Sequence, residues 1–325
     1  MKTKEELLLA ISSSEESTRL YAVEDIADSK YSDLAINLVK RLSIENSAAV
    51  KNSIISALQK LDYSPSYPEL FAFFSSPDAF LRNSSVSILS SYGEEAAIFL
   101  TSYLDHSNRE VRKLIIDCLM EIVNYHPHTR SQVLDVMRAC LHDPDVNVVI
   151  TAVEYIGKLG DKESSDSLIE LFQKTNIPML RSSILDTIFI LGDEFIFNKM
   201  CDLLISNIDN LKFLFLPQIL RFLAGTKRNE EFTSLINSLE KPEIYADDII
   251  KALSWIKKEK QNDYFYQCCF PIIKNLIPKL ENKESKFSFA SLLLDSEDPE
   301  IVFFLNEWKE NDLELNKFLE ENKLL

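Results

Sequence analysis

Apolar residues recur along the chain at helical spacing, in segments separated by short polar stretches. The clearest segment covers residues 143–161, and its apolar positions share one face of a helix with about 3.6 residues per turn: Val148, Ala152, Tyr155, Ile156 and Leu159. Asp143 and Asp145 can accept hydrogen bonds from free N–H groups at the helix start, and Gly160 can end the helix with a positive φ. The pattern predicts this helix and a second one from Ser164 to Phe172.

This segment is one copy of a repeated unit. An apolar residue followed by a cation recurs near the start of each first helix, at intervals of 32, 31, 30, 37 and 32 residues. The slots are Thr18-Arg19, Val50-Lys51, Leu81-Arg82, Val111-Arg112, Val148-Val149 and Leu180-Arg181. Four of the five glycines keep nearly the same period: Gly93, Gly160, Gly192 and Gly225. Two further units fit loosely at 212–225, where Pro217 interrupts the first helix, and at 245–256.

Self-similarity at this period predicts a helical repeat array, because each hairpin buries its apolar face only by stacking on its neighbours. We therefore predict an all-α fold, a right-handed α-solenoid of about eight hairpins in a single domain, 1–325. Residues 1–14 form an N-terminal cap with a Thr3-x-x-Glu6 capping box, 15–256 the repeats, and 257–325 an irregular helical C-terminal cap. In the last segment, helices are expected from Pro299 to about Lys309 and over 312–323. Extra residues between Met120 and Arg130 predict a protruding loop at 124–129.

The run from Asp143-Pro144-Asp145 to Gly160-Asp161 resembles the short bacterial HEAT-like repeat named after phycobilisome lyases. Residues 76–82 with Gly93, and 178–181 with Gly192-Asp193, are similar to it as well. The resemblance covers about 15–256 and is strongest over 76–205. That family includes scaffolds, chromophore lyases, hydroxylases and nucleic-acid enzymes, so the resemblance specifies the fold more closely than the function.

Charge and cysteine content narrow the partners and the compartment. The 325 residues include 35 Lys and Arg against 51 Asp and Glu, a formal net charge of −16. Such a field repels phosphate backbones and anionic lipids, so neither nucleic acid nor a membrane is expected as a partner. The five cysteines have no CxxC spacing and are predicted to be buried thiols. With no secretory apolar segment and no uncharged apolar stretch of about 18 residues, a cytoplasmic location is expected.

The recurring cations invite two interpretations. They could form a stripe that binds phosphate, or a ladder in which each cation pairs with an acid of a neighbouring turn, as in HEAT-like repeats. The candidate acids are Asp78, Asp105, Asp143 and Asp145. Val149 interrupts the series, which favours the ladder.

Enzyme signatures are scarce. His126 and His128 have metal-like spacing but lack a third ligand nearby, so a surface loop is the preferred interpretation and no metal is expected. No His-Glu dipeptide occurs, unlike in the HEAT-like deoxyhypusine hydroxylases. The net charge and the two tryptophans, at 255 and 308, do not match the HEAT-like alkylpurine glycosylases. Phosphate loops, GxSxG and HExxH are absent from the sequence, so we expect no cofactor and no catalysis.

The second helix of each unit offers a candidate binding surface. The resemblance implies that these helices line a concave face, and polar residues opposite their apolar positions should be exposed there. The candidates are Asp33, Asn37, Asp135, Arg138, Asp166, Glu170, Asn198 and Asp202. Acids outnumber bases, so the face is either simply solvated or a groove for a basic or amphipathic protein segment.

Aromatic residues give a second candidate surface. The second helix of the third unit is apolar around most of its circumference, and the preceding unit adds several rings. Phe71, Phe74, Phe99 and Tyr103 could anchor a partner, since aromatic rings supply large contact area at low entropic cost. Overpacking against the small residues of the neighbouring first helix is the alternative.

Together these features predict a non-enzymatic protein-binding scaffold or adaptor. The alternative is a chromophore lyase-like enzyme, or a tetrapyrrole-binding protein, that holds a bilin on the same face.

Overall fold

The computed structural model describes residues 2–29, 31–192, 194–226, 228–259, 262–311 and 316–317. These residues form helices and connecting turns, with no strand among them. The chain divides into two compact units, Met1–Ser164 and Ser165–Leu325. Nothing in the periodicity pointed to a division between Ser164 and Ser165.

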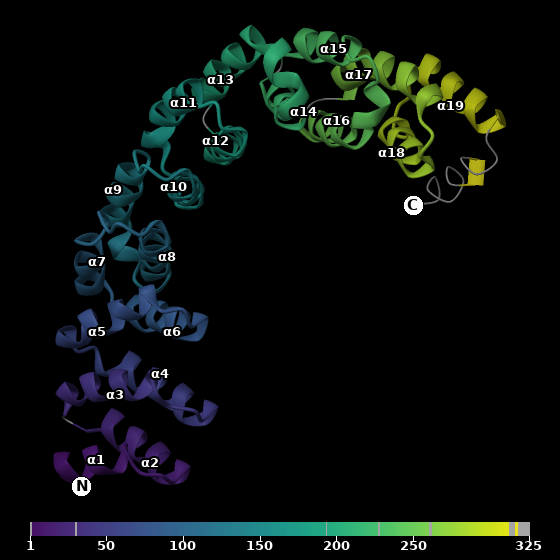
Figure 1. Cartoon of the computed structure of the whole chain (residues 1–325). Helices are drawn as coiled ribbons and strands as arrows, with labels where there is room; N and C mark the ends of the chain where they lie inside the picture. Colours follow the sequence, from purple (N-terminus) through teal and green to yellow (C-terminus); the bar gives the residue numbers. More distant parts are fainter. Residues whose placement is uncertain are drawn as a thin grey trace. The chain divides into compact units, whose positions relative to one another are not determined.

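The first unit is a row of helical hairpins in two layers (Figure 1). The first helices of the hairpins form one layer: α2 (Glu16–Ala27), α4 (Ala48–Leu61), α6 (Ala79–Ser90), α8 (Arg109–Tyr125) and α10 (Val146–Lys158). The second helices form the other: α3 (Ala35–Leu42), α5 (Tyr67–Ala72), α7 (Glu94–Thr101) and α9 (Arg130–Cys140). A short α1 (Lys4–Ala10) packs on α2. Four 3-10 turns, η1 (Ser32–Leu34), η2 (Ser64–Ser66), η4 (Pro127–Thr129) and η5 (Lys162–Ser164), precede second helices, and η3 (Phe73–Ser75) follows α5.

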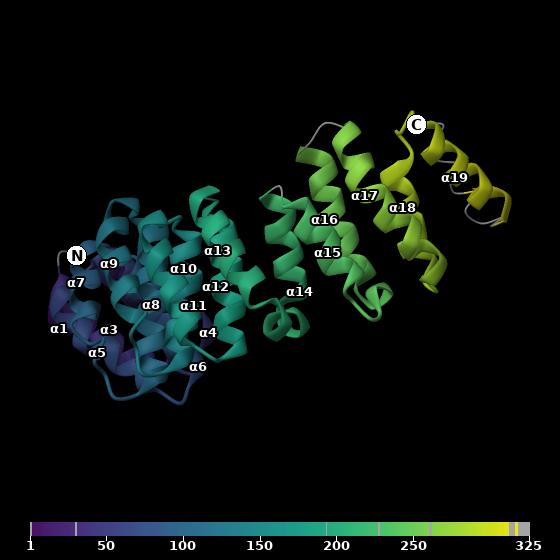
Figure 2. The same cartoon turned by 90° about the horizontal axis from the view of Figure 1, so that it is seen from above.

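The second unit repeats this arrangement, and its helices lie side by side when seen from above (Figure 2). Its second helices are α11 (Ser165–Lys174), α13 (Glu194–Ser206), α15 (Asn229–Asn237) and α17 (Asn262–Leu276). Its first helices are α12 (Pro178–Leu191), α14 (Ile208–Gly225), α16 (Ala246–Glu259) and α18 (Lys283–Leu293). The turns η6 (Pro242–Tyr245) and η7 (Ile277–Lys279) and the helix α19 (Pro299–Asn311) complete it. The helix expected over 312–323 lies almost wholly outside the described residues.

Local sequence signals set many helix ends. Thr3 and Glu6 form the expected capping box of α1. The side chain of Asp145 accepts the N–H of Asn147 and caps α10, and Asp143 accepts the N–H of Asp145. Gly160 follows α10 with φ +66°, a left-handed conformation that glycine adopts at little cost. The repeat signature therefore has a physical basis at both ends of this helix.

Pro217 and Gly225 behave differently from each other. Phe215, two residues before Pro217, has non-helical angles of φ −129° and ψ 20°, so α14 is kinked as the sequence predicted. Gly225 keeps the repeat spacing but is the last residue of α14 and has no positive φ. A Cβ at Gly225 would lie 3.0 Å from Cη2 of Trp255, so packing against Trp255 is its structural role.

The core runs between the two layers of each unit. In the first unit, α8 packs against the second helices α7 and α9. The completely buried side chains are Val111, Ile115, Ile116, Leu119 and Ile122 of α8, Leu100 of α7, and Val133 and Met137 of α9. Cys118, Cys140, Cys201 and Cys269 are buried free thiols, as predicted. Burial raises the pKa of Cys140 and of Cys201 to about 11, so both are protonated at neutral pH.

Two expectations about shape are wrong. Residues 124–129 do not form a free loop: α8 runs to Tyr125 and the η4 turn holds Pro127–Thr129. Thr129 is buried, although Asn124, Tyr125, Pro127 and His128 are exposed. His126 Nε2 lies 2.9 Å from the carbonyl oxygen of Ser91, and the ring packs against Gly93. Within the second unit, the row of hairpins bends with α13, α15 and α17 on its outer side and α14, α16 and α18 on its inner side (Figure 1). The second helices therefore do not line the concave side of this unit.

Candidate protein-binding surface

The exposed side of the second helices, which we call the second-helix layer, carries most of the sequence-predicted site residues. It comprises α3, α5, α7 and α9 in the first unit and α11, α13, α15 and α17 in the second.

The acidic candidates of this layer are exposed, and each has a cation beside it. The exposed fractions of the side chains are 72% for Asp135, 72% for Asp166, 63% for Glu170 and 67% for Asp202. Their partners, in the same order, are Arg138 at 3.3 Å, Lys199 at 2.5 Å, Lys174 at 2.5 Å and Arg228 at 2.7 Å. Exposed ion pairs of this kind contribute at most about 1 kcal/mol each, so a partner's cations can replace the internal ones.

Asp33, Asn37 and Asn198 are only partly exposed. The carboxylate of Asp33 is paired with the ammonium group of Lys4 from α1. The side-chain amide of Asn198 donates to the carbonyl oxygen of Glu194, at 3.1 Å. These residues lie on the predicted helices, and their side chains present less polar surface than the four acids do.

Arg138 holds the fold together and is not a free surface cation, contrary to the prediction. Its Nε and Nη2 donate to the two carboxylate oxygens of Asp161, at 2.8 and 2.6 Å. The Asp161 side chain is only 4% exposed and also accepts the hydroxyl of Ser164. Burial opposes the charge of Asp161, but the hydrogen bonds from Arg138 and Ser164 outweigh it and lower its pKa.

The recurring cations serve the fold, as the ladder hypothesis predicts for two of them. Arg112 forms two 2.8 Å hydrogen bonds to the carboxylate of Asp143. Arg19 forms two 2.9 Å hydrogen bonds to Glu45, an acid that the sequence analysis missed. The Glu45 side chain is fully buried and also binds Arg41.

A second feature is shared by three of these arginines. Nη1 of Arg19, Arg82 and Arg112 donates to the carbonyl oxygens of the residues six and five positions earlier, in the loop before the helix. Lys51 and Arg181 instead lie over the rings of Phe80 and Phe172. Three of the five recurring cations therefore fix the loop before their own helix, and two of these three, Arg19 and Arg112, also form ion pairs.

Aromatic side chains from α5 and α7 form a cluster on the second-helix layer of the first unit. The ring of Phe71 lies 4.4 Å from that of Tyr103 and 5.9 Å from that of Phe99, and Phe99 lies 5.1 Å from Tyr103. All three are partly exposed. Phe74 is only 2% exposed and so cannot contact a partner, contrary to the prediction, because the η3 turn directs it into the core. The buried Phe74 ring packs against Phe71, with 5.1 Å between the ring centroids.

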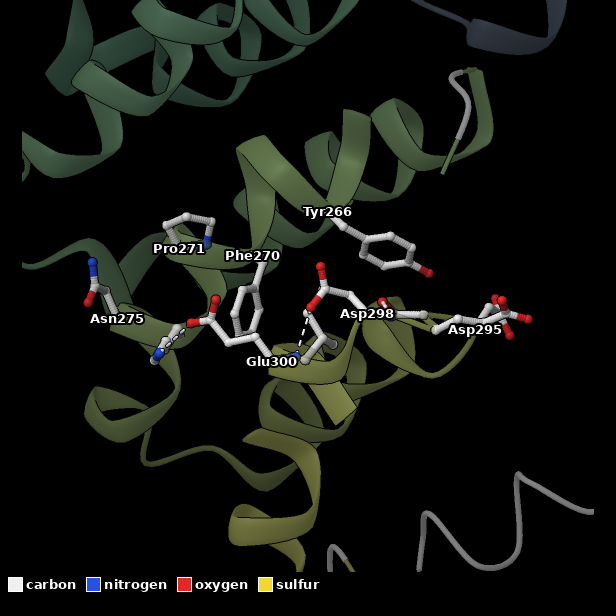
Figure 3. A pocket seen from close by; sticks show the side chains of 11 residues that line it. Tyr266, Phe270, Pro271, Asn275, Asp295, Asp298 and Glu300 are labelled. Atoms are coloured by element: carbon white, nitrogen blue, oxygen red, sulfur yellow. Dashed lines mark hydrogen bonds and ion pairs between the residues drawn. The ribbon is translucent and has the colours of Figure 1, made fainter. Parts of the chain in front are cut away.

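One cavity of the second unit, of about 870 Å³, lies between α17 and the start of α19. Figure 3 labels part of its lining: Tyr266, Phe270, Pro271, Asn275, Asp295, Asp298 and Glu300. Asp295 is paired with Lys257 at 2.9 Å and Glu300 with Lys274 at 3.0 Å. Asp298 caps α19 by accepting the N–H of Glu300. These three carboxylates are thus already engaged within the fold.

Another cavity, of about 330 Å³, opens between α12, α14 and α16 in the first-helix layer of the second unit. Trp255 and Phe189 form its walls, 6.1 Å apart between ring centroids. The guanidinium of Arg221 stacks over Phe189 at 4.1 Å and pairs with Asp186 at 2.5 Å. No sequence pattern indicated this cavity, because its lining comes from three different helices.

In the described part of the chain, no helix combines the length and the hydropathy that crossing a bilayer would require. Within the same residues, no three His, Cys, Asp or Glu side chains gather closely enough to hold a metal ion.

Comparison with known proteins places the fold among helical-repeat proteins. Residues 97–188 match a family model described as HEAT repeats. None of the curated proteins matches the chain.

Similar solved structures include karyopherin Kap121p bound to the extreme C-terminus of the protein phosphatase Cdc14p, at 12% identity, with a TM-score of 0.53 over 94% of this chain and 42% of that one. Kap121p bound to Pho4p gives a TM-score of 0.50, at 12% identity and with the same coverage. Kap95p, from a study of its binding to RanGDP, gives 0.50 at 11% identity over 96% of this chain and 56% of that one. The chain thus spans little more than half of these structures at most. At such identities the likeness concerns the fold: the chain is an α-solenoid of HEAT-type hairpins.

Proposed function

We propose that this α-solenoid is a non-enzymatic scaffold or adaptor that binds a protein partner along its second-helix layer, and that the partner presents a basic or amphipathic segment. The observation that carries the proposal is the exposure of carboxylates on the second helices of each unit. Asp135 in the first unit, and Asp166, Glu170 and Asp202 in the second, are all more than 60% exposed. Among the structures with a similar fold, Kap121p was solved bound to two other proteins, which supports protein binding by such an array.

The acidic face can bind a basic segment if cations of the partner replace the lysines that now pair with its carboxylates. Lys199 pairs with Asp166, and Lys174 pairs with Glu170, and the side chains of both pairs are largely exposed. A lysine or arginine of the partner can take the place of Lys199 or Lys174 at little cost in free energy. The field of the acids mainly raises the association rate, and salt screens it over about 8 Å at physiological ionic strength.

The test begins with capture of the partner from the native cell extract by the tagged full-length chain. Association rates are then measured by surface plasmon resonance for the parent and for the double variant Asp166→Lys/Glu170→Lys. We expect the double variant to associate more slowly than the parent, and its association rate to depend less on salt concentration.

The matched control is Glu121→Lys/Glu154→Lys, because both acids are exposed on first helices and the change in net charge is the same. Its association rate should stay near that of the parent. Equal slowing in both variants would show a global charge effect and would contradict binding on the second-helix layer.

The chromophore-lyase alternative uses the same face with a tetrapyrrole in place of a protein. No feature of the described residues favours it over protein binding. We expect the absorption spectrum of a bilin to stay unchanged when the chain is added. A spectral shift that the double variant abolishes would favour the alternative.

A further inference from the structure

One part of the first unit combines exposed aromatic rings with negative charge that no internal cation offsets. Residues 61–108 contain a single Lys or Arg, Arg82, and six acids: Asp62, Glu69, Asp78, Glu94, Glu95 and Asp105. None of these six forms an ion pair with any described residue, and Arg82 donates to backbone carbonyls. The other acids on this side of the first unit, Asp33, Asp135 and Glu163, each have a cation beside them, so this stretch differs from the rest of the unit.

The aromatic cluster of Phe71, Phe99 and Tyr103 lies within this stretch. Glu95, Phe99 and Tyr103 follow one another at intervals of four along α7 and its C-terminal turn, so they share one side of the helix. Across from them, Phe71 of α5 contacts both Phe99 and Tyr103. Along the chain, acids flank these rings: Glu95 lies four residues before Phe99 at the start of α7, and Asp105 lies two residues after Tyr103.

The layer beneath the cluster is fixed. Tyr67, 2% exposed, packs on Phe99 at 5.6 Å and stacks on Tyr92 at 5.2 Å. Its hydroxyl donates to Asp62 at 2.7 Å. Burial raises the pKa of Tyr67, and the hydrogen bond to Asp62 and the charges of Asp62 and Glu95 raise it further. The exposed rings therefore need little reordering to receive a ligand, and preorganisation of this kind favours binding.

We propose that Phe71, Phe99 and Tyr103 form an anchor site for an amphipathic segment of the protein partner. The segment places an apolar side chain against the three rings and a lysine or arginine beside Glu95 and Asp105. Charge complementarity selects this occupant, since the surface has exposed rings and acids but no free cation. This inference rests on the proposed function and narrows it to one site in the first unit.

The probe is a fluorescein-labelled synthetic 14-residue amphipathic helix, with leucine on one face and lysine on its flanks. Its dissociation constant for the full-length chain is measured by fluorescence anisotropy. One comparison peptide replaces the lysines by glutamate, and another keeps the lysines but replaces the leucines by glutamine. The first peptide should bind, and both comparison peptides should bind at least about tenfold more weakly, a difference of about 1.4 kcal/mol.

Two variants of the chain locate the site. Phe99→Ala should weaken binding of the lysine–leucine peptide at least about tenfold, the effect of losing an interface hot spot. Glu95→Lys removes no packing and should weaken binding at low salt more than at high salt. The matched controls are Phe213→Ala and Glu154→Lys, in first helices, because Phe213 is 75% exposed and Glu154 is exposed. Both should bind the peptide as the parent does, and circular dichroism checks that every variant is folded.

Unchanged binding by both Phe99→Ala and Glu95→Lys would overturn the anchor site. Equal affinity for the leucine-free peptide would overturn it as well, since charge alone would then explain binding. The captured partner separates this inference from the proposed function. If the partner binds Phe99→Ala and Glu95→Lys as tightly as the parent but depends on Asp166 and Glu170, the anchor site fails while the scaffold function stands.

Discussion

Arg112 and Asp143 face each other edge to edge across consecutive hairpins, with Nε–Oδ2 and Nη2–Oδ1 distances of 2.8 Å each. Both side chains are 8% exposed. Arg112 belongs to α8, and Asp143 lies in the loop before α10. Because Nη1 of Arg112 also donates to the carbonyl of His106, one side chain fixes the loops at the start of two successive repeats.

Arg112→Ala should therefore destabilise the first unit, because it leaves the carboxylate of Asp143 buried without its partner. We expect a loss of about 3 kcal/mol, typical of breaking a largely buried, doubly hydrogen-bonded pair. Urea unfolding followed by circular dichroism measures it. Arg82→Ala is the matched control, since Arg82 makes the same loop contacts but no ion pair, and it should lose about 1 kcal/mol. Equal losses would show that the ion pair adds nothing to stability.

Stability should depend on pH through Glu45. Burial disfavours its charge, but hydrogen bonds from Arg19, the N–H of Ser47 and Arg41 prevail and hold its pKa at about 2. An unfolded glutamate titrates near pH 4.3, so the stabilisation is complete above that pH and is lost as the pH falls toward 2. The difference between the folded and unfolded pKa of Glu45 corresponds to about 3 kcal/mol in the free energy of unfolding.

The measurement compares urea unfolding of the parent and of Glu45→Gln at pH 6 and pH 3. The parent should be the more stable protein at pH 6, and the gap between the two should shrink at pH 3. A gap of the same size at both pH values would rule out the charge of Glu45 as the cause.

Gly225→Ala and Gly160→Ala should act by different mechanisms. A Cβ at Gly225 would press on the Trp255 ring, whereas nothing lies within 4 Å of a Cβ at Gly160, where φ is +66°. Each substitution should lower the free energy of unfolding by about 1 kcal/mol. Gly225→Ala does so by displacing the Trp255 ring, and Gly160→Ala by straining the backbone. In a Trp308→Phe background, only Gly225→Ala should shift the fluorescence emission of Trp255. A shift caused by Gly160→Ala instead would contradict this assignment.

The sequence predicted those features whose cause is local. Asp145 caps its own helix and Gly160 ends it, and both effects depend on neighbours within a few residues. Glu45 escaped notice because its loop lacks the Asp-Pro-Asp pattern, although it precedes a first helix as Asp143 does. The ion pairs of Asp166 and Asp202 depend on the packing of neighbouring helices, which the repeat period alone does not specify.

The aromatic surplus was visible in the sequence, but its division into buried and exposed rings was not. A 3-10 turn at Phe73–Ser75 breaks the helical spacing after α5, so Phe74 turns inward while Phe71 stays at the surface. For residues 124–129, too, the sequence pattern did not reveal how the side chains pack. Its extra residues suggested a loop, yet the space beside Gly93 lets His126 pack inward and lets α8 run on.

Hydrogen–deuterium exchange of the full-length chain, with and without the captured protein partner, tests the central claim most directly. Amides of the second helices should exchange more slowly in the complex, in α5 and α7 above all, since binding restricts their opening. The first helices α12, α14 and α16 should be unchanged. Protection confined to those first helices, with none in α5, α7, α11 or α13, would contradict binding along the second-helix layer.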